Sequence, residues 1–290
     1  LSDMKKYNYR IIITTAIAIS FIGCDDNLTI NPEQDITTEI AISSPSNLQK
    51  ILNNAYGDAR SSALYGGGIA LASELIANDG DLYWDGTYVQ PNQYDEKAIL
   101  TDNSYVQSIW LRAYKISNQT NIVLDNLAVF TDTDDKNKAK GEAQFLRGLV
   151  YFDLGRLFSK PYVAGAVNSQ LGVPIILEPV LNPAKITFPS RNTLEEVYTQ
   201  VILDLKDAYA LLPASNGVYA TKYSAAALLA RVYLQKGDYI NARAMANMAI
   251  TTSGAALTGT FAKAFNNSEN STEDLFAWQV SSQDVSSNDN

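Results

Sequence analysis

The stretch that most restricts how this chain folds is residues 222–253, which reads KYSAAALLARVYLQKGDYINARAMANMAITTS. Its apolar side chains recur at the three- and four-residue spacing of one face of an α-helix. Gly237 and Asp238 interrupt this spacing, which then resumes, so the pattern predicts two helices joined by a glycine-containing turn. The predicted inward positions are Ala226, Leu229, Ala230, Tyr233 and Leu234 before the turn, and Tyr239, Ala242, Ala246, Met248, Ala249 and Ile250 after it.

Small side chains mark the contact between these two helices. Ala230, Ala242 and Ala249 allow the helix axes to approach closely, and Tyr233 fills the space beside them. The order of Tyr, Gly, Asp-Tyr and spaced alanines resembles a tetratricopeptide repeat. The alternative is an ordinary antiparallel helix pair.

A second part of the chain repeats this pattern at an offset of 82 residues. Residues 142–155 align with residues 224–237, and a long irregular insertion with five prolines, residues 161–189, separates the two. Proline cannot continue a helix, so the repeats are interrupted. We expect equivalent positions to be buried in both copies, namely Leu146, Val150, Leu228 and Val232.

The rest of the chain also has a mainly helical pattern, and the predicted class is all-α or mostly α: tetratricopeptide-like helical hairpins with long irregular loop insertions. Thr193 and Glu196 form a capping box. Ser44 is expected to cap an earlier helix, residues 78–94 are expected to be loop, and residues 173–177 are expected to be a short extended piece. Helices are predicted within 37–60 and at 70–77, 104–127, 136–158 and 193–212, the last with Val197, Val201, Leu205, Ala208 and Leu212 inward.

Composition excludes several functional classes. The net charge of −9 disfavours a general nucleic-acid role, which needs clustered Lys and Arg. The chain has no His, which removes Ser-His-Asp and Cys-His catalysis and most zinc chemistry. A single Cys excludes an internal disulfide.

The first segment of the chain is typical of a targeting signal. Lys5, Lys6 and Arg10 precede an apolar run at residues 11–22, which is too short to span a membrane. The only Cys, Cys24, follows a small residue directly after this run and resembles the lipidated Cys of a bacterial lipobox, although Phe21 departs from the usual Leu. The alternative is a secretory signal with a chance Cys. We expect a lipoprotein signal peptide at 1–23, a tether at 24–35 and one helical domain at 36–290.

Several segments together resemble the SusD/RagB family of Bacteroidetes outer-membrane lipoproteins. They are residues 141–156 (GEAQFLRGLVYFDLGR), 171–174 (LGVP), 189–191 (PSR), 196–198 (EVY), 204–205 (DL), 211–213 (LLP), 225–239 and 273–276 (EDLF). The resemblance implies a cell-surface, lipid-anchored protein without catalytic activity or cofactor. It would capture glycans and deliver them to a TonB-dependent (SusC-like) transporter. Family members are longer, so the resemblance also indicates the N-terminal part of a longer protein.

A sugar site needs exposed aromatic rings beside amide and carboxylate groups. One short stretch offers both, and turn-forming residues argue against its complete burial. Its candidate ligand-binding residues are Asn78, Asp79, Asp81, Tyr83, Trp84 and Tyr88, with Asp85 beside them.

Four alternatives stay open for this stretch and for the chain. In the first, Trp84 is a core anchor and the acids cap a turn. In the second, Asp79, Asp81 and Asp85 bind calcium, although their spacing is not that of an EF-hand. In the third, the protein is a lipid-anchored scaffold that binds only other proteins. In the fourth, a carboxylate pair hydrolyses glycosides, although no apolar-flanked pair stands out.

Overall fold

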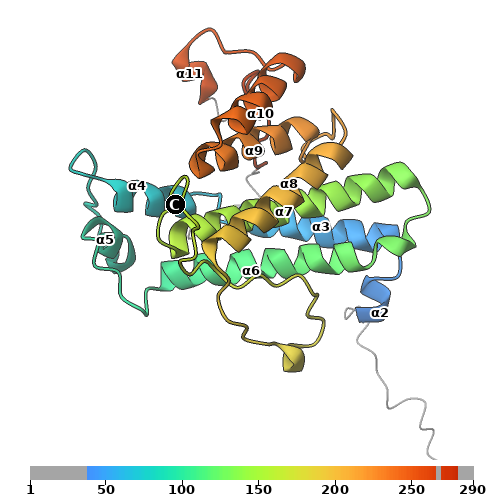
Figure 1. The fold of residues 1–290 in the computed structure, drawn as a ribbon, viewed down its shortest axis with the longest axis horizontal. Helices are drawn as coiled ribbons and strands as arrows, with labels where there is room; N and C mark the ends of the chain where they lie inside the picture. Colours follow the sequence, from blue (N-terminus) through green and yellow to red (C-terminus); the bar gives the residue numbers. More distant parts are fainter. Residues whose placement is uncertain (1–37, 266–268, 280–290) are drawn as a thin grey trace, which may run out of the picture. The chain divides into compact units, whose positions relative to one another are not determined.

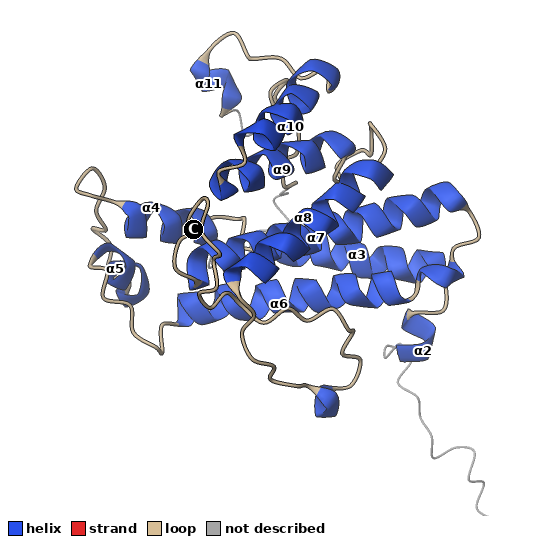
Figure 2. Cartoon of the chain, viewed as in Figure 1, coloured by secondary structure: helices blue, strands red, loops and turns tan. Residues whose placement is uncertain are grey.

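The computed structural model describes residues 38–265 and 269–279, and within them the only regular elements are helices (Figure 2). The predicted mostly helical class is confirmed. Cys24 and the segments predicted as signal peptide and tether lie outside the described residues. The helices are α2 (Thr38–Ala41), α3 (Pro45–Ala59), α4 (Gly68–Ala77), α5 (Val89–Asp95), α6 (Ser104–Asp125), η2 (Leu127–Val129), α7 (Thr133–Phe158), η3 (Pro183–Lys185), α8 (Leu194–Leu211), α9 (Lys222–Lys236), α10 (Tyr239–Thr252) and α11 (Phe261–Ala264).

Side-chain caps fix where several of these helices begin. The predicted capping box is confirmed: Thr193 Oγ1 accepts from the Glu196 amide at 3.2 Å, and the Glu196 carboxylate accepts from the Thr193 amide at 2.7 Å. Ser44 caps α3, as predicted, by accepting from the Asn47 amide at 3.3 Å. Each cap satisfies an amide that the first helical turn leaves without a partner.

Helix α7 is the centre of the packing, with α8, α6, α3 and α9 against it (Figure 1). It meets α8 along Gly141, Gly148 and Gly155, one residue in every seven. A Cβ at Gly148 would lie 2.9 Å from the Leu205 side chain, so only glycine allows this approach. The four positions expected to be buried in the two copies are buried, as are the five positions predicted inward for residues 193–212.

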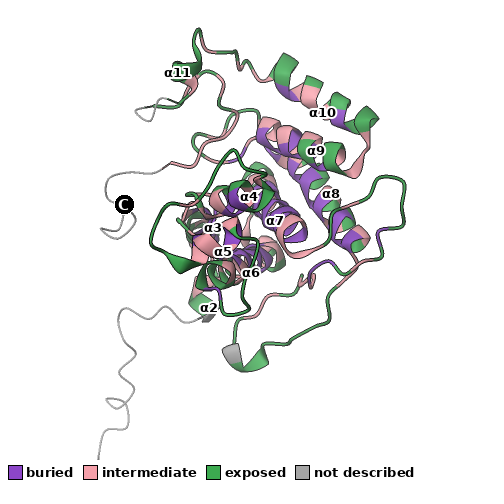
Figure 3. Cartoon of the chain, turned by 90° about the vertical axis from the view of Figure 1, so that its left-hand side faces the viewer, coloured by how far each residue is buried: buried purple, intermediate pink, exposed green. Residues whose placement is uncertain are grey.

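The predicted hairpin at residues 222–253 is confirmed as α9 and α10, which pack against each other. Gly237 ends α9 in the left-handed conformation, with φ of 79°. Three inward positions are wrong, because Leu234, Tyr239 and Ile250 are 59, 68 and 71% exposed. The buried residues of α10 are Ala242 and Ala249, and its outer face is open (Figure 3).

One further expectation needs correction. Residues 78–94 are not all loop, since α5 forms with Pro91 in its first turn, where proline is tolerated, and Tyr94 is 1% exposed. Residues 173–177 contain no helix or turn, and a single β-bridge between Leu171 and Thr193 lies beside them. None of the described helices is both long enough and apolar enough to cross a membrane.

Candidate binding sites

The aromatic loop, residues 78–88, connects α4 to α5 (Figure 1). Asn78 shapes it: its side-chain oxygen accepts from the amides of Gly80 and Leu82 at 2.8 and 3.0 Å, and its amide donates to the Leu82 carbonyl. These bonds form a local turn of the kind that Asn favours. The Asn78 side chain is therefore committed to the structure of the loop.

The three predicted aromatic residues of this loop differ in their exposure to solvent. Tyr83 and Tyr88 are 73 and 64% exposed, whereas Trp84 is half-buried and packs against the core. The Trp84 ring lies over Gly86, where a Cβ would come within 2.3 Å of it. The Trp84 amide donates to Asp95 Oδ2 at 2.9 Å. The rings available to a ligand are those of the two tyrosines.

The carboxylates of this loop, Asp79, Asp81 and Asp85, are all exposed. In the part of the chain that the structure describes, no group of three or more His, Cys, Asp or Glu side chains could hold a metal ion. Asp79, Asp81 and Asp85 therefore do not come together as such a group in this structure. What the loop offers is two exposed rings beside hydrogen-bond acceptors.

A second candidate site is a pocket of about 580 Å³ between α6 and the segment 174–189, which we call the α6 pocket. Sequence reasoning missed it, because its walls lie some sixty residues apart and neither wall has a local motif. Most of its lining is apolar: Trp110, Leu111, Tyr114, Ser117, Asn118, Asn121, Pro174, Ile176, Val180, Leu181, Ile186, Thr187, Phe188 and Pro189.

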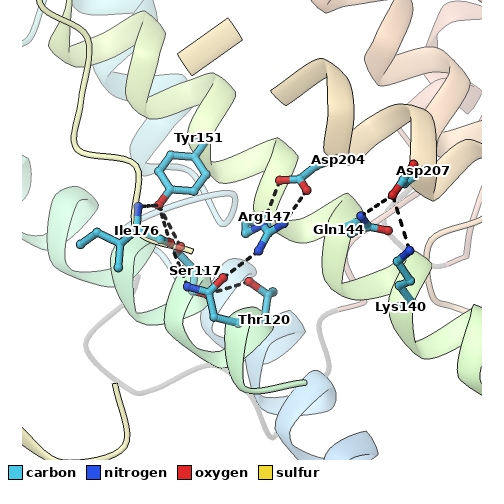
Figure 4. Close-up of polar contacts among 10 residues, drawn as sticks. Ser117, Thr120, Lys140, Gln144, Arg147, Tyr151, Ile176, Asp204 and Asp207 are labelled. Carbon is cyan, nitrogen blue, oxygen red and sulfur yellow. Dashed lines mark hydrogen bonds and ion pairs between the residues drawn. The ribbon is translucent and has the colours of Figure 1, made fainter. Parts of the chain in front are cut away.

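Side chains of α6 and α7 hold one wall of this pocket in place (Figure 4). Tyr151 Oη accepts from the Ile176 amide at 2.8 Å and donates to its carbonyl at 3.1 Å. Asn121 Nδ2 donates to the same carbonyl at 2.8 Å. Burial raises the pKa of the Tyr151 hydroxyl, so it stays protonated and able to donate.

An ion pair behind this wall fixes the position of Asn121. Arg147 donates to both carboxylate oxygens of Asp204, at 2.9 and 2.6 Å, and to Asn121 Oδ1 at 2.9 Å (Figure 4). The Arg147 and Asp204 side chains are 9 and 2% exposed. A bidentate pair of this kind has fixed geometry. It joins α7 to α8 and orients the amide that holds the pocket wall.

Comparison with known proteins supplies the context for both sites. A model of the SusD-like family, described as starch-binding and associating with the outer membrane, matches residues 27–234. SusD-like protein P2 of Formosa agariphila is 29% identical over 251 residues, which cover 85% of this chain and 46% of that protein. SusD-like protein P25 of the same organism is 23% identical and is covered to 52%. The chain spans about half the length of these curated relatives.

Solved structures of other proteins are also similar to this chain. A putative sugar binding protein from Bacteroides vulgatus is 30% identical with a TM-score of 0.74, over 84% of this chain and 56% of that one. A SusD superfamily protein from Bacteroides thetaiotaomicron is 30% identical with a TM-score of 0.65, over 77 and 50% of the two chains. The family model alone covers well over half of the sequence, and the fold agrees with it, so this chain belongs to the SusD-like family.

Proposed function

We propose that this protein is a cell-surface lipoprotein that captures oligosaccharides and delivers them to a TonB-dependent, SusC-like transporter, without catalysing a reaction. The match of the starch-binding family model to residues 27–234 carries the proposal. The sugar-binding description of the Bacteroides vulgatus relative supports it. The anchor in this proposal is a lipid on Cys24, which follows the apolar run at residues 11–22.

In this proposal the aromatic loop makes direct ligand contacts. Tyr83 and Tyr88 supply ring faces on which the apolar face of a sugar ring packs. The exposed carboxylates of Asp79 and Asp81 accept hydrogen bonds from sugar hydroxyls. Asn78 and Trp84 contribute as well, the first by setting the turn and the second by fixing the loop to the core.

The test is titration calorimetry of the full chain against a panel of neutral oligosaccharides. We expect saturable binding, weakened about fivefold or more in a Tyr83→Ala, Tyr88→Ala double variant, since two ring contacts are worth about 1–3 kcal/mol. Tyr239→Ala is the matched control, because Tyr239 is 68% exposed on α10, away from the loop. Trp84→Ala is also expected to weaken binding, but Trp84 packs on the core, so that variant needs a fold check.

Two results would count against the proposal in different ways. Unchanged affinity in the double tyrosine variant would show that the oligosaccharide does not bind at the aromatic loop. A folded protein that binds no oligosaccharide of the panel would contradict glycan capture itself.

A scaffold that binds only proteins is the second candidate function. The open outer face of α10 favours it, with Ile240 and Ile250 84 and 71% exposed. Exposed apolar patches of this kind often mark protein contacts. Recovery of a transporter from membranes by a chain that binds no glycan would support this second function over the first.

A further inference from the structure

The α6 pocket has a wall that is held rigidly and independently of any ligand. Four side chains of α6 and α7 bond the backbone of residues 174–180. Besides Tyr151 and Asn121, Tyr114 Oη donates to the Pro174 carbonyl at 2.7 Å. Asn118 accepts from the Val180 amide at 2.7 Å and donates to its carbonyl at 2.9 Å. A site shaped in advance loses less conformational entropy on binding.

The polar side chains that α6 contributes to this pocket are already used inside the protein. Both ends of the Asn118 amide bond Val180, and both ends of the Asn121 amide bond Ile176 and Arg147. Ser117 Oγ donates to Tyr151 Oη at 3.2 Å. A ligand rich in hydroxyl groups would leave many of them without partners, which is costly in a desolvated pocket.

The rim is apolar and open to solvent. Phe188, Leu111 and Ile186 are 95, 60 and 52% exposed. No residue of the lining carries a charge, in a chain whose net charge is −9. Covering this rim removes apolar surface from water, which is favourable in proportion to the area.

We propose that the α6 pocket is a ligand site for a neutral, hydrogen-bond-poor molecule with a ring system. The rings of Trp110, Tyr114 and Phe188 pack against that ring system. The volume of about 580 Å³ lies within the range of small-molecule sites, which are mostly apolar with a few polar groups. The site is distinct from the aromatic loop and does not depend on glycan capture.

The experiment uses the neutral dye N-phenyl-1-naphthylamine and the full chain, with fluorescence as the readout. We expect saturable binding at one site. Leu111→Gln and Phe188→Ser are each expected to weaken it about fivefold or more, because each removes apolar contact area. Both positions are exposed, so circular dichroism is expected to show unchanged helix content.

Two control variants separate the pocket from other apolar surface. Leu203→Gln changes a leucine on α8 that is 56% exposed and outside the pocket lining, and Ile240→Gln changes the open face of α10. Both are expected to bind the dye as the parent does.

Three outcomes would overturn the assignment. The first is unchanged dye affinity in Leu111→Gln and Phe188→Ser. The second is loss of the dye in Ile240→Gln, which would place it on α10. The third is competitive displacement of the dye by an oligosaccharide, which would make the pocket a sugar site. Glycan affinity is measured separately, with the Tyr83 and Tyr88 variants. A negative result for glycan capture can therefore be told apart from a negative result for the α6 pocket.

Discussion

Helices α7 and α8 meet along glycines, whereas α10 buries two alanines and packs Met245 against the core. Gly141, Gly148 and Gly155 admit Leu212, Leu205 and Val197 of the opposing helix, and α7 is buried along most of its length. The buried residues of α10 are Ala242 and Ala249. Both pairs are helical hairpins, but α7 is enclosed by neighbours, while α10 packs mainly on α9 and has an open outer face (Figure 3).

This difference extends to polar groups. Helix α7 carries Arg147, Glu142 and Asp153 at 7% exposure or less, whereas the buried residues of α9 and α10 include no titratable side chain. A helix that is enclosed on all sides has to place its polar residues inside, where each needs a partner. The stability of the α7 region should therefore depend on buried pairs and on pH more strongly than that of the α9–α10 hairpin, whose Lys236 pairs with Glu195 at a partly exposed position.

The largest effect is expected from Arg147→Ala. This change leaves the Asp204 carboxylate, 1% exposed, without its charged partner. Breaking a buried ion pair on one side costs about 3–5 kcal/mol of unfolding free energy. Urea denaturation followed by circular dichroism measures the loss.

The matched control is Lys140→Ala, also on α7. Lys140 pairs with Asp207 at 3.6 Å, and both side chains are well exposed, at 38 and 53%. Exposed pairs contribute about 1 kcal/mol or less. If Arg147→Ala and Lys140→Ala cost the same, burial adds nothing to the contribution of an ion pair between α7 and α8. A double change, Arg147→Met with Asp204→Leu, should recover most of the loss.

The second effect concerns Glu142, which is 1% exposed on α7. Its Oε1 accepts from Asn216 at 2.7 Å, and its Oε2 has no partner. Burial raises the pKa of this carboxyl from 4.5 to about 7, against the weaker opposing effects of Asn216, Lys138 and Gln49. The folded state thus holds this proton more tightly than the unfolded chain. Its contribution to the unfolding free energy is complete below pH 4.5 and is lost as pH rises to about 7.

Glu142→Gln removes this dependence, since the amide stays neutral. Between pH 4.5 and 7.5 the parent should lose up to about 3 kcal/mol relative to the variant. Denaturation of both proteins across this range measures the difference. Glu74→Gln, at an exposed carboxyl of α4, should run parallel to the parent. Parallel profiles for Glu142→Gln as well would mean that the Glu142 pKa is ordinary.

The features that could be predicted from sequence are those set by neighbours along the chain. The Thr193 capping box, the Gly237 turn and the inward stripe of α8 depend on residues within a few positions of one another. Burial of Leu146 and Leu228 followed from the repeat of one helical pattern at an offset of 82 residues. Such patterns reflect the geometry of one helix, which sequence encodes directly.

Other features depend on contacts that no local pattern encodes. Arg147 meets Asp204 across 57 residues, and the α6 pocket joins α6 to the segment 174–189. Tyr239 and Ile250 fit the helical period, yet they are exposed, because periodicity says nothing about whether a neighbour covers that face. Likewise, the sequence of the aromatic loop offers three rings, and only the fold assigns Trp84 to the core side.

The third prediction tests the glycine contact. Gly148→Ala adds a Cβ about 2.9 Å from the Leu205 side chain, so overpacking outweighs the gain in helix propensity, and we expect a net loss of about 1–2 kcal/mol. Gly57→Ala on α3 is the control, because a Cβ there meets nothing within 4 Å. That variant should gain about 0.5–1 kcal/mol. Stabilisation by both changes would show that α7 and α8 do not need glycine at their contact.

The smallest effect is expected on the open face of α10. Ile240→Gln changes a side chain that is 84% exposed, so the unfolding free energy should change by no more than about 0.5 kcal/mol. Leu228→Ala, at a 6% exposed position of α9, should cost about 2–5 kcal/mol and confirms that the assay reports this hairpin. Both values come from urea denaturation at several protein concentrations. A loss above about 1 kcal/mol for Ile240→Gln, growing with concentration, would mean that self-association covers this face in solution. The contrast between an enclosed α7 and an open α10 would then hold only for the isolated chain.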